Sequence, residues 1–267
     1  MVKLGKFHAL ENVGRKSGNG VKNHFKNVLD YVRRTDHKCR YLYCAGNLTK
    51  PIPFFGNPES ALVVTVGLNP SKREFDHHRG WLEAIGDSAL ETRLLNYFSP
   101  NSHPHPFFNP WTEALAHLTP RISYREGTAA HLDLSPRATD FPSNHQTNNP
   151  NDIRWREQFL KMLSEDVLWF FEALKKCKQA RLVMMAGTAT KHFYLDQFVS
   201  KYAPPNTCLK YDGRGDGRNV SFHNLVGLDL KLPVFFSGAG PAFQQGARLI
   251  QNVNLNQEKL NSKLRPA

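Results

Sequence analysis

The stretch Ala61-Leu62-Val63-Val64-Thr65-Val66 decides the fold class of this chain. It is a nearly continuous apolar run. Such a run is typical of a strand in a parallel sheet, because a strand covered by helices on both faces shows neither face to water. Three comparable runs follow at wide spacing and complete a set of four predicted strands: residues 129–134, 181–186 and 232–236.

Between these runs, apolar residues recur at intervals of three and four, which predicts helices. The predicted helices cover residues 21–34, 88–98, 111–118, 155–176, 188–202 and 242–253. Strands that alternate with helices favour a parallel sheet. We therefore expect an α/β fold: a three-layer sandwich with a central, mainly parallel four-stranded sheet and helices on both faces.

The 267 residues are enough for one large domain. We expect residues 1–20, which are rich in Gly, Lys and Asn, to form a flexible basic arm, and residues 21–267 to form a single domain. Cys208-Leu209-Lys210 and Val220-Ser221-Phe222 flank a glycine-rich segment, which predicts a β-hairpin. The long Pro-rich loops 100–110 and 136–150 are expected to be walls of a site.

The chain is strongly basic. Its 35 Lys and Arg outnumber 23 Asp and Glu, for a formal charge of +12 and a pI of about 9.6. A positive surplus of this size attracts phosphate polyanions, although a basic surface without such a partner has the same composition. Charge therefore indicates a class of partner, not a reaction.

No apolar run approaches the roughly 20 residues that span a bilayer, and Met1–Lys6 leads into polar sequence instead of a signal peptide core. We therefore expect a cytoplasmic protein with no membrane partner.

Four cysteines are too few for a disulfide framework in a chain of this size. His37, Cys39 and Cys44 could begin a zinc site, but no second ligand pair completes it. We expect no metal and no cofactor.

Ligands of open parallel sheets bind beyond the carboxyl ends of the strands. All four predicted strands are followed by small or turn-forming residues, and the fourth by Ser237-Gly238-Ala239-Gly240-Pro241. Glycines there let a ligand approach the backbone amides closely. The same residues are ordinary in strand-to-helix turns. For Gly187-Thr188 we prefer that explanation, because Thr188 suits a helix N-cap.

The first exit is more specific. Val64-Thr65-Val66-Gly67-Leu68-Asn69-Pro70-Ser71, with Phe75 four residues on, resembles the first signature of the uracil-DNA glycosylase superfamily. The mismatch-specific and single-strand-selective branches carry a Gly-x-Asn-Pro turn directly after the first core strand. Over residues 61–253, the succession of strands, a long helix and a second turn after the fourth strand is similar too.

The resemblance implies that Asn69 orients the water that attacks the sugar carbon as the base departs. It also implies that the turn and an aromatic side chain hold a base flipped out of the helix; the matching residues are Gly67, Leu68, Pro70 and Phe75. Because asparagine is a weak base, catalysis would depend on water placement and electrostatic stabilisation of the leaving base.

The family often places a residue that reads the base edge after the second strand. His131 and Asp133 are the candidates here, and the alternation of side chains along a strand would point them to the same side. A structural core histidine fits this position equally well.

The chain departs from many members of the family after the fourth strand, where their His-Pro-Ser turn is replaced by a turn without histidine. The mismatch-specific branch lacks that histidine too. The spacing of the cysteines does not match that of the iron–sulfur cluster in some relatives.

We expect nucleic-acid contacts from the turns after the first and fourth predicted strands and from the hairpin tip: Ser71, Lys72, Ser237, Gly238, Gly240, Arg214 and Arg218. A solvated turn explains the hairpin tip equally well.

The resemblance and the charge together predict a monomeric DNA glycosylase-like enzyme that hydrolyses the N-glycosidic bond of a damaged or mismatched base, such as uracil. DNA is favoured over RNA as the partner. Two alternatives stay open. One is a catalytically silent nucleic-acid-binding protein of the same fold, which the missing histidine favours. The other is an enzyme that binds a free nucleotide or another small phosphorylated compound at the same turns.

Overall fold

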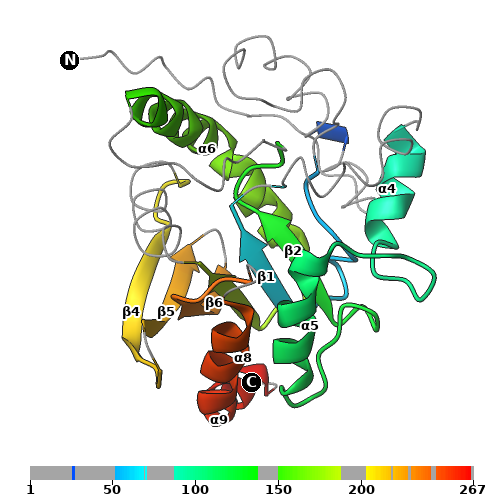
Figure 1. Cartoon of the computed structure of the whole chain (residues 1–267), viewed down its shortest axis with the longest axis vertical. Coiled ribbons are helices and arrows are strands. Elements are labelled where there is room, and N and C mark those ends of the chain that lie inside the picture. The colour runs from blue at the N-terminus through cyan, green and yellow to red at the C-terminus, as the bar shows by residue number, and fades with distance from the viewer. Residues whose placement is uncertain are drawn as a thin grey trace.

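The computed structural model describes residues 26–27, 52–68, 70, 87–137, 150–187, 203–217, 219–227, 230–241 and 245–265. These residues form helices packed around a single sheet (Figure 1). The predicted basic arm, residues 1–20, lies outside the described residues.

Within the described residues the sheet has six strands, in the order β2-β1-β3-β6-β5-β4. The four predicted apolar runs form its parallel part: β1 (Val63–Gly67), β2 (Ala129–Asp133), β3 (Leu182–Ala186) and β6 (Leu230–Ser237). The predicted hairpin is also confirmed, as β4 (Cys208–Arg214) and β5 (Val220–Gly227), which pair antiparallel. The α/β class of the fold is therefore correct.

The expectation of a four-stranded sheet is wrong, because the hairpin joins the sheet. β5 pairs antiparallel with β6 along its whole length, from Val220 opposite Ser237 to Gly227 opposite Leu230. Without the hairpin, β6 would be an edge strand with unpaired backbone groups next to a buried apolar face. The outer strand β4 is largely exposed instead. The sheet is thus mixed, with four parallel strands and an antiparallel pair at one side.

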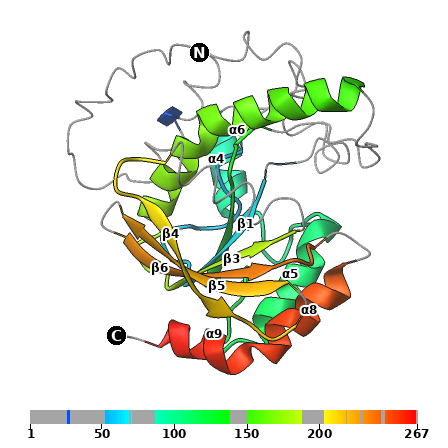
Figure 2. The same cartoon turned by 90° about the vertical axis from the view of Figure 1, so that its left-hand side faces the viewer.

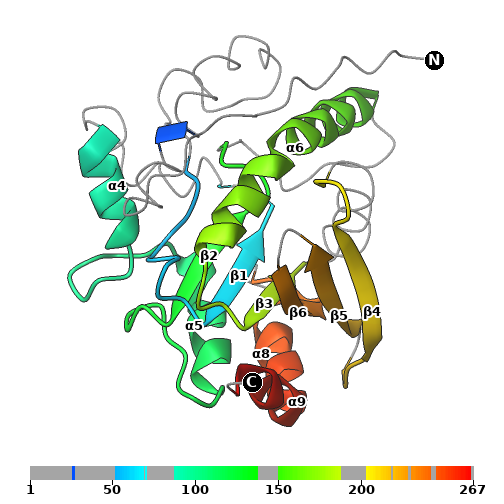
Figure 3. The same ribbon diagram turned by 180° about the vertical axis from the view of Figure 1, so that it is seen from behind.

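Helices cover both faces of the sheet (Figure 2). The long helix α6 (Pro150–Lys176) lies across one face, as the view from behind shows most clearly (Figure 3). The other face is covered by α5 (Asn109–Ala116), α8 (Gly246–Leu255) and α9 (Gln257–Leu264). The predicted three-layer arrangement is therefore present in the described residues.

The predicted helices agree with the structure where it describes them. Residues 88–98 and 111–118 correspond to α4 (Asp87–Leu95) and α5, and 155–176 lies within α6. The last predicted helix, 242–253, corresponds to α8, which begins at Gly246, and α9 follows it. Of residues 21–34 only Lys26 and Asn27 are described, and they are helical; residues 188–202 lie outside the described residues.

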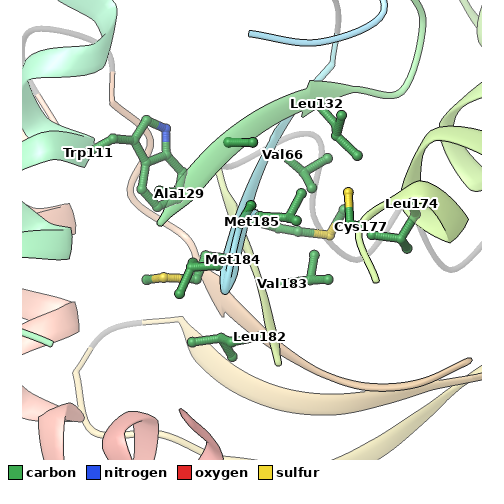
Figure 4. Packing of buried hydrophobic residues seen from close by; sticks show 14 of the residues in the cluster. Val66, Trp111, Ala129, Leu132, Leu174, Cys177, Leu182, Val183, Met184 and Met185 are labelled. Carbon is green, nitrogen blue, oxygen red and sulfur yellow. The ribbon is translucent and has the colours of Figure 1, made fainter. Parts of the chain in front are cut away.

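The strands of the parallel part are buried on both faces, as their apolar composition predicts. Side chains of β3 alternate between the two faces (Figure 4). Val183 and Met185 point towards Leu174 and Cys177 at the end of α6, whereas Leu182 and Met184 point to the side of Trp111 on α5 (Figure 4). Burial of a large apolar side chain stabilises the fold by about 1.5–3 kcal/mol, so this double-sided packing holds the strand ends in place.

In the part of the chain that the structure describes, no helix combines the length and the apolar character that crossing a membrane requires.

Candidate functional site

The carboxyl ends of the parallel strands lie at one edge of the sheet. Gly67 at the end of β1 pairs with Asp133 at the end of β2, and Ala186 at the end of β3 pairs with Ser237 at the end of β6. Ser237 also pairs with Val220, which brings the tip of the β4–β5 hairpin to the same edge.

β1 lies at the point where the strand order reverses. The next strand along the chain, β2, pairs on one side of β1, and β3 pairs on the other. In open parallel sheets, connections that leave in opposite directions form a crevice at this point, and ligands bind there. The segment that follows Gly67 therefore leaves the sheet where fold geometry favours a site.

A line of four buried polar side chains ends at this edge. The Tyr124 hydroxyl lies 2.5 Å from Thr65 Oγ1, and Thr65 Oγ1 lies 2.8 Å from His131 Nδ1. On the other side of the ring, His131 Nε2 lies 3.4 Å from Asp133 Oδ1. All four residues are buried, with exposed fractions of 6% or less. The alternation along β2 does place His131 and Asp133 on the same side, as predicted.

Thr65 is the middle of this line. In the tautomer of His131 that carries its proton on Nε2, towards Asp133, Nδ1 is an acceptor. The Thr65 hydroxyl, which also lies 3.4 Å from the Ala130 carbonyl, then donates to Nδ1 and accepts from Tyr124. Burial, and to a smaller degree the charge of Asp133, holds the pKa of Tyr124 well above its ordinary value, although the hydrogen bond with Thr65 opposes this shift. Tyr124 therefore keeps its proton and can donate it to Thr65 Oγ1.

Aromatic rings pack around the histidine. The ring of His131 meets those of Phe107 and Phe108 nearly edge to face, at centroid distances of 5.7 and 5.1 Å, and Phe55 lies 6.0 Å away. Phe107 and Phe108 belong to the short 3₁₀ helix η3 (Pro106–Phe108), which lies in the Pro-rich loop 100–110. These rings limit rotation of the imidazole and keep water away from it.

Gly67 has a steric reason to be glycine. A Cβ atom at this position would collide with Asp133 Oδ1 and would lie 3.1 Å from His131 Nε2. The carboxylate of Asp133 therefore lies directly over the backbone of β1, at the first residue of the Gly-x-Asn-Pro turn.

Asp133 has one polar partner among the described residues. Its side chain is 4% exposed, and within the described part of the chain its only polar contact is the one with His131. A buried carboxylate is costly unless donors surround it, and the one described contact, at 3.4 Å, is longer than an ordinary hydrogen bond. The carboxylate lies at the edge where open parallel sheets commonly bind ligands.

The segment after β2 is anchored to α6 by a buried ion pair. Arg137 Nε and Nη2 donate to Asp166 at 2.9 and 3.1 Å, and the Ser135 hydroxyl donates to the same carboxylate at 2.7 Å. Both charged side chains are almost fully buried. Because Ser135 and Arg137 directly follow Asp133, this pair holds the exit of β2 in one conformation.

The polar groups in the turn after β6 are largely satisfied by hydrogen bonds within the protein. Ser237 Oγ accepts from the Ala239 amide and from Asn252 Nδ2, and the Gly238 amide donates to the Asn219 carbonyl. The Gly240 amide donates to Gln245 Oε1, and its Cα lies against Gly187 at the exit of β3. The predicted nucleic-acid contacts at this turn, Ser237, Gly238 and Gly240, are all buried, and the amides of the two glycines already have partners.

A cavity of about 480 Å³ lies between this turn, the hairpin tip and α8. Its lining includes the polar residues Gln251, Asn252 and Arg248, together with Gly238. Arg248 is exposed and makes no ion pair with a described residue. The hairpin residue Arg214, at the end of β4, is exposed as well.

The structure thus brings together Gly67, His131 and Asp133, and it places Leu68 and Pro70 beside them in the chain. The Leu68 carbonyl accepts from the Ser135 amide, which continues the pairing of the two exits, and Pro70 is buried. The remaining predicted site residues lie outside the described residues: Asn69, Ser71, Lys72, Phe75 and Arg218.

Sequence reasoning missed Thr65, Tyr124 and the Arg137–Asp166 pair. Thr65 is the one polar residue in the apolar run that became β1, and Asp166 lies in the middle of the buried stripe of α6. A polar residue that interrupts an apolar pattern is the signal that points to such a buried network. Tyr124 and Arg248 carry no comparable signal.

In the described part of the chain, no group of three or more His, Cys, Asp or Glu side chains is arranged to hold a metal ion. The chain matches no protein-family model and none of the curated proteins with which it was compared. Its function must therefore be argued from the residues at this edge of the sheet.

Proposed function

We propose that this chain is a DNA glycosylase-like enzyme, which binds a base flipped out of DNA at the exits of β1 and β2 and hydrolyses its N-glycosidic bond. The observation that carries the proposal is the buried carboxylate of Asp133, which lies beside His131 and next to the reversal point of the sheet. The Gly-x-Asn-Pro turn that begins at Gly67 supports the same assignment, because it follows β1 directly.

In the proposed reaction a water molecule supplies a hydroxyl to the sugar carbon C1′. The bond between C1′ and the base nitrogen breaks, its electron pair leaves with the base, and the base takes up the remaining proton of the water. Asn69, by the family resemblance, would orient that water, and Asp133 would hold the edge of the base. Removing one well-placed polar group commonly costs about 10²–10³-fold in rate, so two such groups would contribute strongly.

Binding of the DNA strand is supported by the charge and by the neighbouring cavity. Strands are spaced by about 4.8 Å, so the exit of β6 is roughly 10 Å from that of β1 along this edge. Arg248, which lines the cavity, and Arg214, at the end of β4, are exposed cations. Phosphate contacts of this kind supply sequence-independent affinity.

The test is base release by the purified chain. Oligonucleotides that carry uracil, hypoxanthine, xanthine, 8-oxoguanine or a mismatched thymine are incubated with the protein and analysed for abasic sites. We expect release of at least one base, and loss of that release in Asp133→Ala. Glu126→Gln is the matched control. Glu126 is an exposed carboxylate just before the first residue of β2, whereas Asp133 is the last residue of that strand.

Other outcomes would contradict the proposal. Tight binding of oligonucleotides without release would assign the chain to the catalytically silent DNA-binding proteins. Binding of free nucleotides but not of oligonucleotides would favour the small-molecule enzyme.

A further inference from the structure

The cavity of about 480 Å³ beside α8 lies at the exit of β6 and is not lined by His131 or Asp133. Its described walls come from the hairpin tip, with Gly217 and Asn219, from the turn after β6, with Gly238, and from one face of α8. Pockets that bind small molecules commonly have volumes of roughly 300–1,000 Å³. The cavity is therefore large enough for a ligand of the size of a nucleotide.

The face of α8 that lines the cavity is polar along most of its length. Arg248, Gln251, Asn252 and Leu255 line it, and their spacing of three and four residues puts them on one side of the helix. Leu249, the residue after Arg248, is fully buried in the core instead. One side of α8 thus holds the helix on the sheet, while another presents a cation and two amides to the cavity.

The charge of the described lining is positive. Besides Arg248, its polar members are all Asn or Gln, and none of the described lining residues is acidic. Asp216, which precedes Gly217 in the hairpin tip, is exposed and lies outside the lining. A guanidinium matches the oxygens of a phosphate with two parallel donors, and amides can donate to the same oxygens or to hydroxyl groups. The lining therefore fits an anionic ligand that is rich in acceptors.

Hydrogen bonds hold the walls of the cavity in place without a ligand. Asn256, at the junction of α8 and α9, joins the backbone of Asp216 twice: Nδ2 donates to the carbonyl at 2.8 Å, and Oδ1 accepts from the amide at 2.9 Å. On the other side, Asn252 Nδ2 donates to Ser237 Oγ at 2.9 Å. A ligand that enters such a preformed site does not have to order the chain, which lowers the entropic cost of binding.

Gly217 keeps part of this space open. Its φ of +98° lies in the left-handed region, which glycine adopts without strain. A Cβ atom there would lie 2.5 Å from Asn252 Oδ1 and 3.6 Å from Leu255, and both of these residues line the cavity. Any other residue at this position would therefore push into the lining, whereas glycine lets the hairpin tip close the cavity without filling it.

We propose that this cavity binds the phosphate group of a phosphate ester, with Arg248 as its principal contact. The proposal goes beyond the proposed function, because it concerns the exit of β6 and needs neither Asp133 nor hydrolysis of a base. The same phosphate chemistry occurs in a free nucleotide and in a DNA strand, and competition between the two separates these sources.

Calorimetric titration of the full chain with AMP, adenosine and inorganic phosphate tests the proposal. AMP should bind at least about tenfold more tightly than adenosine, because only AMP offers oxygens for charge-assisted hydrogen bonds, and inorganic phosphate should compete with AMP. Arg248→Gln should lower the affinity for AMP at least about tenfold for the same reason. Arg125→Gln is the matched control, because Arg125 is an exposed cation in the turn before β2, at the opposite edge of the sheet.

A second pair of variants tests the sign of the charge. Gln251→Glu preserves the shape of an exposed lining residue and adds a negative charge. The affinity for AMP should fall at least about threefold at low salt, and the loss should shrink at high salt, where charges are screened. Asn254→Asp is the matched control, since it adds the same charge at an exposed position of α8 outside the described lining.

Three results would overturn the proposal: adenosine that binds as tightly as AMP, no binding of AMP or phosphate at millimolar concentration, or wild-type affinity in either Arg248→Gln or Gln251→Glu. Both of these side chains are exposed, so both variants should fold.

Competition identifies the source of the phosphate. Displacement of AMP by a short oligothymidylate without terminal phosphates assigns the cavity to the phosphates of a DNA strand, and failure to displace it assigns the cavity to a small ester. Either result supports a phosphate site. Base release without phosphate binding here would support the glycosylase proposal and overturn this one, whereas phosphate binding that depends on Arg248, with no base release, would do the reverse.

Discussion

Replacing Thr65 by valine should break the line of hydrogen bonds that orients His131, while it preserves the shape of β1. Thr65 and valine are both β-branched and of nearly equal size, and Thr65 is fully buried. Its hydroxyl joins Tyr124 at 2.5 Å to His131 at 2.8 Å. The variant therefore removes a polar link and leaves the packing unchanged.

The magnitude follows from the groups left without partners. Thr65→Val leaves the Tyr124 hydroxyl and His131 Nδ1 buried and unsatisfied, and each such group costs about 1–3 kcal/mol. We therefore expect the free energy of unfolding to fall by about 2–6 kcal/mol. Adding Tyr124→Phe removes one of the two unsatisfied groups, so the double variant should be more stable than the sum of the single changes predicts, by about 1–3 kcal/mol.

The assay is urea unfolding followed by circular dichroism, with the four proteins of the cycle compared at constant m-value. Thr92→Val is the matched control, because Thr92 lies on the exposed face of α4 and bonds only within its own turn; its effect should stay within about 0.5 kcal/mol. A loss below about 1 kcal/mol in Thr65→Val, or strict additivity in the cycle, would refute the hydrogen-bonded line.

Three further predictions concern the site and its surroundings. Asn69→Ala should leave folding and DNA affinity nearly unchanged and lower base release at least about tenfold, since one positioned group commonly carries about 10²–10³-fold; single-turnover kinetics measures it. Replacing Arg214 and Arg218 together by alanine should weaken DNA binding regardless of sequence and flatten the salt dependence of the affinity by about one or two units of slope. Iodoacetamide should modify the exposed Cys208 in the native protein but Cys177 only after unfolding, because burial raises the pKa of the Cys177 thiol to about 12 and shields it; peptide mapping reads this out.

Each of these predictions has a control or a contrary outcome. Unchanged activity in Asn69→Ala would remove that residue from the mechanism. For the arginines, replacing the exposed Arg121 and Arg125 removes the same charge far from the site edge; an equal change of salt slope there would leave the hairpin tip without a specific role. Rapid native modification of Cys177 would contradict its burial at the end of α6.

The raised pKa of Cys177 also has a consequence for stability. An unfolded thiol ionises near its ordinary pKa of about 8.5, whereas the folded one stays protonated to about 12. Between these values the unfolded chain binds fewer protons, so stability should fall as the pH rises through this window. The Cys177→Ala variant should show a shallower fall over the same range.

The local sequence pattern was enough to predict the parallel strands, because a strand buried on both faces has to be apolar along most of its length. It was also enough to put His131 and Asp133 on one side of a strand, since side chains alternate with a period of two. The hairpin followed from glycine-rich turn chemistry, but its membership of the sheet did not. Pairing of β5 with β6 depends on which edge of the parallel sheet is left open, and no local signal carries that information.

The partners in the candidate site were decided by the tertiary structure alone. Thr65 and His131 are 66 positions apart in the sequence, and Ser135 and Asp166 are 31 apart. Their contacts exist because β1 lies beside β2, and because α6 crosses the opposite face of the sheet and reaches the exit of β2. The sequence by itself determined the apolar strands, the turn at Gly67 and the acceptor chemistry of Asp133. Only folding determined that this carboxylate is buried against Gly67 and held by His131, because burial and orientation are properties of the assembled sheet, not of any segment within it.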